Sequence, residues 1–243
     1  MNNLKWVFFD LDNTLWDFDA NAREALKVLF ERHQLHLHSD YHVDQFISLY
    51  EDVNKAYWKK YEKGEVSKEI LRTRRFADTF DLMGIQPALQ PLNVWEEYLD
   101  ICPYMPILIP GALECLSLVS QKFKVGILTN GFEETQQIKL KSSGIGVFVD
   151  FMQSSERVGF PKPTSEFFSH VFESLSIGPS ECFYIGDNLD TDVWGGIQAG
   201  IKTAFFDKDK NFHDVTLPSE LVSNKLFAGK FSNLDDFARI FVI

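Results

Sequence analysis

The sequence predicts an α/β fold in which a parallel sheet with helices on both faces is interrupted by an inserted all-helical domain. Three features of the 243-residue chain predict it. The apolar run Trp6–Phe9 has the length and composition of a buried strand. Residues 17–102 then show helical periodicity without a strand pattern, and from residue 110 short apolar runs alternate with helical stretches. Strands joined by helices pair in parallel through right-handed crossovers, so the outer segments are expected to form one Rossmann-like sheet.

The expected domains are an α/β core of residues 1–16 and 103–243 and a helical domain of residues 17–102. In the helical domain, apolar residues recur at helical spacing over residues 20–33, 40–61, 67–84 and 89–99. Prolines mark the return to the core. Further core strands are expected at residues 124–130, 148–152, 182–185 and 202–206, and helices at 110–120, 133–143, 164–175, up to Ala199 and after Ser232.

The composition narrows the range of functions. Hydrophobic residues make up 45% of the chain, enough for a sizeable core, and the formal net charge is −11. A nucleic-acid polymer is not an expected partner, because binding its phosphates requires a basic face. Cys102, Cys115 and Cys182 form no CxxC pair, which favours reduced core thiols and a cytoplasmic location. No stretch is apolar enough to span a membrane, and the sequence assigns no oligomeric state.

Two carboxylates, Asp10 and Asp12, follow the first strand. Side chains alternate along extended chain, so the two are expected on the same side of the strand end. Like charges held that close require a cation between them or a shifted pKa. An Asx-type turn is the alternative interpretation of this pair, because Asp and Asn also favour turns.

The other predicted strands also end in polar residues. Parallel sheets bind ligands at the carboxyl ends of their strands, so these residues are expected to converge on one edge. They are Thr129 and Asn130 after the second strand, Lys162 after the third, and Asp187 after the fourth, with Asp190 and Asp192 close behind.

Four segments together resemble the motifs of the haloacid dehalogenase-like (HAD) phosphohydrolase superfamily, in order along the chain. They are Asp10-Leu11-Asp12-Asn13-Thr14, Leu128-Thr129-Asn130, Lys162-Pro163 and Gly186-Asp187-Asn188-Leu189-Asp190-Thr191-Asp192. The helical insert after the first motif is similar to the cap of the helical-cap subclass. The resemblance implies a Mg²⁺-dependent phosphatase acting on a small phosphorylated metabolite through an aspartyl-phosphate intermediate.

The resemblance also implies a role for each site residue. Asp10 is the expected nucleophile and a metal ligand, and Asp12 is the expected general acid and base. Asp187, Asp192 and the backbone carbonyl of Asp12 are expected to complete the metal site. Asp190 competes with Asp192 for its role, and spacing favours Asp192. Substrate binding is expected from Thr129, Asn130 and Lys162, with Lys162 also orienting Asp10.

An extended resemblance favours the pyrimidine nucleoside 5′-monophosphatase branch. It rests on Thr129-Asn130-Gly131-Phe132, residues 136–140, Ser155-Glu156-Arg157-Val158-Gly159 and residues 195–200. A sugar-phosphate or phosphoglycolate phosphatase and a phosphomutase are the alternatives. A dehalogenase is disfavoured because those relatives lack the second aspartate, and a non-catalytic binding module because all four motifs are present. Trp16 and Phe18, beside the first motif, are candidates for lining the substrate pocket.

Overall fold

A computed structural model describes residues 3–208 and 217–242 of the chain. It divides into two compact units. The first combines residues 1–18 with 106–243, and the second contains residues 19–105. The first unit is a sheet with helices and the second is a group of helices, and each is described separately below.

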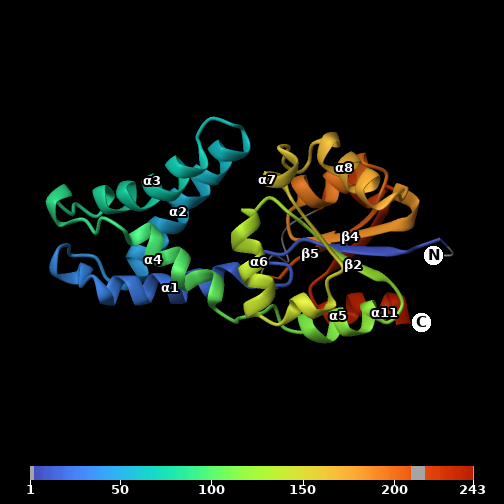
Figure 1. Ribbon diagram of the computed structural model, residues 1–243, viewed down its shortest axis with the longest axis horizontal. Helices are drawn as coiled ribbons and strands as arrows, with labels where there is room; N and C mark the ends of the chain where they lie inside the picture. The colour runs from blue at the N-terminus through green and yellow to red at the C-terminus, as the bar shows by residue number, and fades with distance from the viewer. Residues whose placement is uncertain (1–2, 209–216, 243) are drawn as a thin grey trace. The chain divides into compact units, whose positions relative to one another are not determined.

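The first unit is built on one parallel sheet of six strands in the order β3-β2-β1-β4-β5-β6 (Figure 1). The first strand of the chain therefore lies in the middle, between β2 and β4. This arrangement confirms the predicted Rossmann-like α/β fold. The strands are β1 (Trp6–Phe9), β2 (Lys124–Thr129), β3 (Phe151–Ser154), β4 (Cys182–Gly186), β5 (Lys202–Phe206) and β6 (Phe227–Phe231).

Alternating side chains of the central strands supply the cores on the two faces of the sheet. Phe8 and Tyr184 pack with Phe167 and Phe168 of helix α8. Phe9 points to the opposite face, where its ring lies 5.8 Å from that of Phe237 in α11. Figure 1 accordingly shows α8 on one side of the sheet and α5 with α11 on the other.

Helices connect the strands of this unit. They are α5 (Ala112–Ser120), α6 (Glu133–Ser142), α7 (Ser155–Val158), α8 (Ser165–Leu175), α9 (Gly195–Gln198), α10 (Ser219–Val222) and α11 (Leu234–Val242). Short 3-10 turns occupy Ile145–Phe148 and Pro179–Glu181, and a π-helical turn occupies Leu189–Trp194. Single π turns inside helices occur frequently at functional sites.

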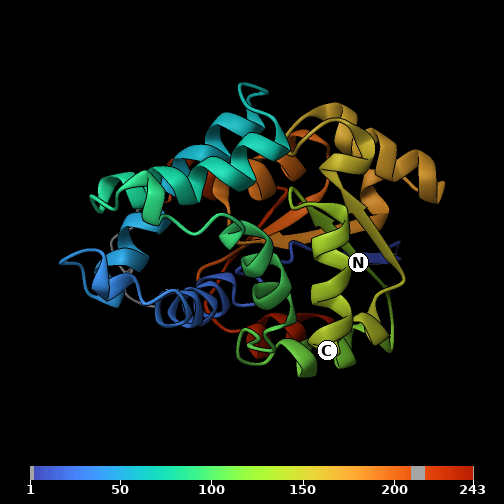
Figure 2. The same ribbon diagram turned by 60° about the vertical axis from the view of Figure 1, so that its left-hand side comes forward.

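The second unit, residues 19–105, consists of helices joined by turns and loops; the structure describes all of these residues and shows no strand among them (Figure 2). Its interior is aromatic: Phe30, Phe46 and Phe80 form one row of rings, and Tyr50, Phe76 and Tyr98 form another. Its helices are α1 (Phe18–Arg32), α2 (Val43–Glu62), α3 (Lys68–Leu82) and α4 (Val94–Ile101), with 3-10 turns at Leu35–Leu37, Pro87–Leu89 and Cys102–Tyr104.

The two chain segments that lead to and from the helical unit are paired with each other. The Asp17 N–H donates to the Ile107 carbonyl at 3.1 Å, and the Ile109 N–H donates to the Leu15 carbonyl at 2.9 Å. An isolated antiparallel bridge joins Trp16 to Leu108. The chain therefore leaves and re-enters the sheet unit through one short two-stranded ribbon.

Several elements differ from the sequence prediction, including the short helices α7 and α10, which no predicted helix matches. β6 was not expected, because glycine and lysine are rare in strands, and Gly229 lies where the register with β5 shifts. The strand expected at residues 148–152 is β3, Phe151–Ser154, preceded by a 3-10 turn. The helix expected to end near Ala199 begins as a π-helical turn.

Cys102, Cys115 and Cys182 are buried and form no disulfide, which agrees with the predicted reduced core thiols. Within residues 3–208 and 217–242, no helix has the length and apolarity needed to cross a membrane.

Candidate active site

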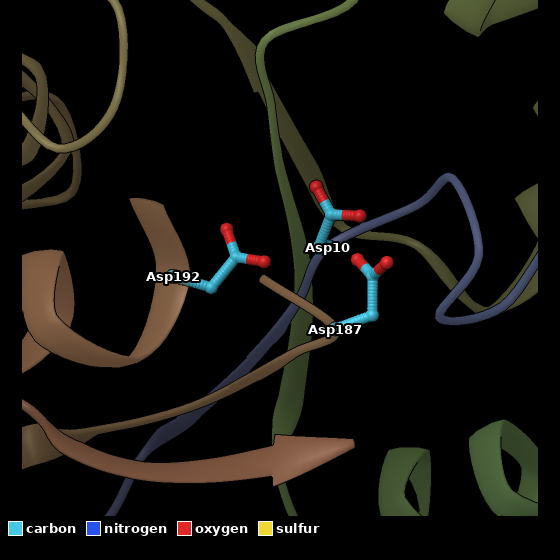
Figure 3. Close-up of side chains that lie close together, drawn as sticks. All are labelled: Asp10, Asp187 and Asp192. Atoms are coloured by element: carbon cyan, nitrogen blue, oxygen red, sulfur yellow. The ribbon is translucent and has the colours of Figure 1, made fainter. Parts of the chain in front are cut away.

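Three carboxylates meet at the carboxyl edge of the central strands (Figure 3). Asp10 follows β1, Asp187 follows β4, and Asp192 lies in the π-helical turn. One oxygen from each lies within 4.8 Å of the others. Asp10 and Asp192 are buried, with 7% and 1% of their surfaces exposed. An acidic cluster this compact is stable only with compensating positive charge.

Lys162 supplies one compensating charge from within the cluster. Its Nζ lies 2.8 Å from Asp10 Oδ1 and 2.7 Å from Asp192 Oδ1. The same nitrogen lies 2.8 Å from the Leu128 carbonyl and 2.8 Å from the Tyr184 hydroxyl. An ammonium has three hydrogens, so these four neighbours occupy it fully. Lys162 thus holds two carboxylates in place from a buried position.

Tyr184 completes this network from β4. Its hydroxyl lies 2.7 Å from Asp192 Oδ1 and accepts from Lys162. Asp192 Oδ2 accepts from the Asn188 N–H at 3.1 Å, so both oxygens of this carboxylate are engaged by the protein. Gly186 makes room for it, because a Cβ there would collide with the Asp192 carboxylate. Asp190 is exposed and lies outside the cluster, so the geometry favours Asp192 for the role that the two share.

Burial sets the electrostatics of the cluster. Desolvation raises the pKa of Asp10 to about 7; Lys162 opposes the rise and Asp192 adds to it. Desolvation, with the charges of Asp10 and Asp192, also raises the pKa of Asp187 well above its usual value. Burial alone would lower the pKa of Lys162, but Asp10 and Asp192 outweigh it and raise the value. The cluster is therefore stabilised when it takes up a proton or when a cation binds to it.

Asp12 lies apart from the cluster and has a lysine of its own. Lys139 of α6 donates to Asp12 Oδ1 at 2.6 Å, and Gln136 Nε2 donates to Asp12 Oδ2 at 2.9 Å. The side chain of Asp12 is 28% exposed, whereas that of Lys139 is 4% exposed. The sequence predicts a cation or a shifted pKa for the Asp10–Asp12 pair, and the raised pKa of Asp10, to which the charge of Asp12 contributes, agrees with the second alternative. Each carboxylate is paired with a different lysine.

A tight turn separates the two aspartates from the helical unit. Asn13 has a φ of 61°, a left-handed conformation that Asn tolerates better than most residues. The N–H groups of Leu15 and Trp16 both donate back to the Leu11 carbonyl. Thr14 is fully buried, and its hydroxyl lies 3.4 Å from Asp187 Oδ1. The turn thus links the end of β1 to the end of β4.

Thr129 has a hydroxyl whose acceptor positions are filled. Its Oγ1 accepts from the Gly131 N–H at 3.0 Å and from Gln136 Nε2 at 3.0 Å. A hydroxyl has two acceptor positions and one hydrogen to donate. In the described part of the chain no acceptor takes that hydrogen, so Thr129 is suited to donate to a phosphoryl oxygen.

The Asn130 side chain holds the backbone of Lys162. Its Oδ1 accepts from the Lys162 N–H at 2.8 Å, and its Nδ2 donates to the Lys162 carbonyl at 3.1 Å. This double contact fixes the loop that carries Lys162. The amide of this side chain is therefore engaged by the protein, and the substrate contact expected of Asn130 stays a prediction.

The sequence alone assigns no individual role to Gln136, Lys139 and Tyr184. Gln136 and Lys139 enter only within residues 136–140 of the extended resemblance, and Tyr184 only within an apolar strand. The general rule that a buried tyrosine hydroxyl needs a partner is the available signal for Tyr184. Trp16, a candidate for lining the substrate pocket, is fully buried, and its ring centre lies 4.4 Å from Lys139 Nζ.

Enzymes with a parallel α/β core bind their ligands at the carboxyl ends of the strands. The acidic cluster of this chain lies at that place, which defines the chain as an enzyme of this class. The match to a family model makes the assignment specific: residues 4–200 match the model of the haloacid dehalogenase-like hydrolases. The chain belongs to this family, which confirms the resemblance drawn from its four motifs.

Individual relatives support the assignment. The putative HAD-hydrolase YfnB of Bacillus subtilis is 30% identical over 210 residues, 86% of each chain. The magnesium-bound crystal structure of YfnB has a TM-score of 0.83 with 26% identity, covering 99% of this chain and all of the other. The pyrimidine 5′-nucleotidase YjjG of Escherichia coli is 30% identical over 201 residues, 82% of this chain and 84% of YjjG.

A relative named for a sugar phosphate is about as similar. The ribulose-1,5-bisphosphate 5-phosphatase of Halopiger xanaduensis is 30% identical over 207 residues, 83% of this chain and 84% of that enzyme. Named phosphatases of both substrate classes therefore resemble the chain over most of its length.

Proposed function

We propose that this protein, a phosphatase of the HAD-like family, is a Mg²⁺-dependent nucleoside 5′-monophosphatase that works through an aspartyl-phosphate intermediate. The observation that carries the proposal is the cluster of Asp10, Asp187 and Asp192 around Lys162, with Asp12 held separately beside it. Two carboxylates in different surroundings suit two roles, one as a nucleophile and one as a carrier of protons.

The acidic cluster fits a divalent cation. Its donors are carboxylate oxygens, the ligands that Mg²⁺ prefers, and Mg²⁺ is usually held by only one or two of them. Asp192 has both oxygens engaged by hydrogen bonds, whereas Asp10 and Asp187 each have one oxygen that accepts no hydrogen bond from another described residue. Asp10 and Asp187 would therefore hold Mg²⁺ directly. Bound there, Mg²⁺ would offset the repulsion between Asp10 and an anionic phosphate.

Asp10 would attack phosphorus. The P–O bond to the leaving group breaks as the Asp10–phosphorus bond forms, and Asp12 gives its proton to the leaving oxygen. Asp12 would then take a proton from water, which attacks the phosphorus of the acyl phosphate. This second step releases inorganic phosphate and returns the Asp10 carboxylate. Thr129 would donate its free hydroxyl hydrogen to a phosphoryl oxygen, and Lys162 would keep Asp10 oriented.

A nucleoside monophosphate is the preferred substrate class, because the extended motif resemblance and the similarity to YjjG both favour it. A sugar-phosphate phosphatase, including one for phosphoglycolate, is the second candidate, and the Halopiger relative favours it. A phosphomutase uses the same first step and differs in excluding water. The presence of Asp12 disfavours a dehalogenase.

The proposal is tested by replacing Asp10 with asparagine, which keeps the size of the side chain and removes its nucleophilic charge. We expect Asp10→Asn to lower kcat for an aryl phosphate in Mg²⁺ at least about 10⁴-fold. Asp190→Asn, which changes an exposed acid of the same edge, should leave kcat unchanged. Retained turnover in Asp10→Asn would refute the assignment of Asp10 as the nucleophile.

A panel of nucleotides, sugar phosphates and phosphoglycolate, compared by kcat/KM, tests the substrate class. A higher kcat/KM for sugar phosphates than for nucleotides would overturn the nucleotidase assignment.

A further inference from the structure

The carboxylate of Asp12 is fixed by two side chains from a single helix. Lys139 Nζ lies 2.6 Å from Oδ1, and Gln136 Nε2 lies 2.9 Å from Oδ2. Both oxygens therefore accept a hydrogen bond from α6, and the plane of the carboxylate is determined by that helix. The 28% of this side chain that stays exposed leaves room for another group to approach it.

Lys139 occupies an unusual place for a lysine in the last turn of a helix. Such residues normally extend into solvent, as the exposed Lys141 does in the same turn. Lys139 is instead 3% exposed, and its Nζ lies 4.4 Å from the ring centre of Trp16 and 5.4 Å from that of Phe18. Removing a lysine from water is costly unless it is paired. The position is thus built around the contact with Asp12.

Gln136 connects Asp12 to Thr129. Its two amide hydrogens go to Asp12 Oδ2 and to Thr129 Oγ1. The neighbouring Gly131 provides the space, because a Cβ at that position would collide with the Gln136 amide. One side chain therefore sets the spacing between the proton-carrying carboxylate and the hydroxyl suited to bind phosphate.

We propose that Lys139 and Gln136 are positioning residues that hold Asp12 in line with the leaving oxygen. Trp16 and Phe18, which lie on the segment leading to the helical unit, hold Lys139 in turn. This assignment rests on the proposed phosphatase function and adds to it two residues outside the four motifs.

The test compares two substrates that differ in how much they need a proton. Phenyl phosphate has a basic leaving group that requires protonation, whereas 2,4-dinitrophenyl phosphate leaves without it. We expect Lys139→Met to lower kcat/KM for phenyl phosphate by about 100-fold, the lower end of what a positioned general acid contributes. The loss with 2,4-dinitrophenyl phosphate should be less than about 3-fold, because no proton transfer is needed there.

Matched variants separate positioning from a general effect on folding. Lys141→Met changes an exposed lysine of the same helix, and Gln137→Leu is the exposed counterpart of Gln136→Leu. Both controls should resemble the wild type. Lys139→Arg should regain most of the activity on phenyl phosphate, because it keeps a charged donor. The increase in melting temperature on adding Mg²⁺ should stay at the wild-type value in Lys139→Met.

Equal losses on both substrates in Lys139→Met and Gln136→Leu would overturn the positioning role while leaving the phosphatase assignment intact. A wild-type protein that hydrolyses neither phosphate in Mg²⁺ would instead refute the proposed function, and the positioning role would fall with it. If Lys139→Met lowers activity much less in the Asp12→Asn variant than in the wild type, this result would support a direct interaction between Lys139 and Asp12.

Discussion

The two buried lysines of the site differ in what surrounds them. Lys162 contacts two carboxylates, a carbonyl and a hydroxyl, so all its hydrogens are used within a closed network. Lys139 contacts a single carboxylate and two aromatic rings. The first arrangement concentrates negative charge around a fixed centre, which suits a cation. The second fixes the direction of one partly exposed carboxylate, which suits proton transfer.

The strongest test of this contrast is to remove Lys162. Lys162→Met would leave the buried carboxylates of Asp10 and Asp192 without their positive partner. We expect the free energy of unfolding to fall by about 3–5 kcal/mol, with activity lost. Urea denaturation at neutral pH measures the change. Lys139→Met, which leaves only a partly exposed carboxylate unpaired, should cost clearly less; equal costs would contradict the contrast.

A smaller effect is expected from the hydroxyl that closes the Lys162 network. Tyr184→Phe removes one hydrogen-bond partner from Lys162 and one from Asp192, both buried. The expected loss of stability is about 1–3 kcal/mol. Tyr104→Phe is the control, because Tyr104 is 57% exposed. If both variants unfold at the same urea concentration as the wild type, the network is not closed by Tyr184.

The pH dependence of Mg²⁺ binding sharpens the contrast further. The raised pKa values of Asp10, about 7, and of Asp187 mean that the folded, metal-free protein holds protons that the unfolded chain has released. The contribution of these two carboxyl groups to the free energy of unfolding is therefore lost as the pH rises from about 4 toward 7 and above. The proposed Mg²⁺ would bind the ionised carboxylates, so its stabilising effect is expected to grow over the same range.

The expected change is about 1.4 kcal/mol in the Mg²⁺-binding free energy per pH unit for each proton displaced. Thermal unfolding with and without Mg²⁺ at pH 6 and pH 8 measures it. Asp187→Asn should remove most of the Mg²⁺ effect at both values. A Mg²⁺-induced increase in melting temperature that is the same at pH 6 and pH 8 would show that the cation does not displace these protons.

Much of the fold was predictable because strand ends carry strong local signals. The apolar run before Asp10 and the polar residues after each strand follow from periodicity and composition alone. β6 was not predictable in the same way, because Gly229 and Lys230 oppose strand formation and only pairing with β5 stabilises it. Its position depends on a neighbour that is distant in the sequence.

The motif residues of the site could be predicted from the sequence, but the residues that hold them in place could not. Lys139 has the sequence environment of a residue that compensates a helix dipole, and nothing local indicates that Asp12, 127 positions earlier, is its partner. The position of Trp16 beside the first motif makes it a candidate for lining the substrate pocket, and only the structure shows that it packs against Lys139. Such contacts depend on how α6 lies against the end of β1, which no single segment encodes.

The two-stranded ribbon at residues 15–17 and 107–109 has a consequence for engineering and for evolution. Its strands are hydrogen-bonded to each other within the sheet unit, so the chain ends produced by removing the helical unit would already be adjacent. A turn of a few residues is enough to close such a gap. We therefore expect that the helical unit can be deleted at this junction, or exchanged for another, while the strands of the sheet stay paired.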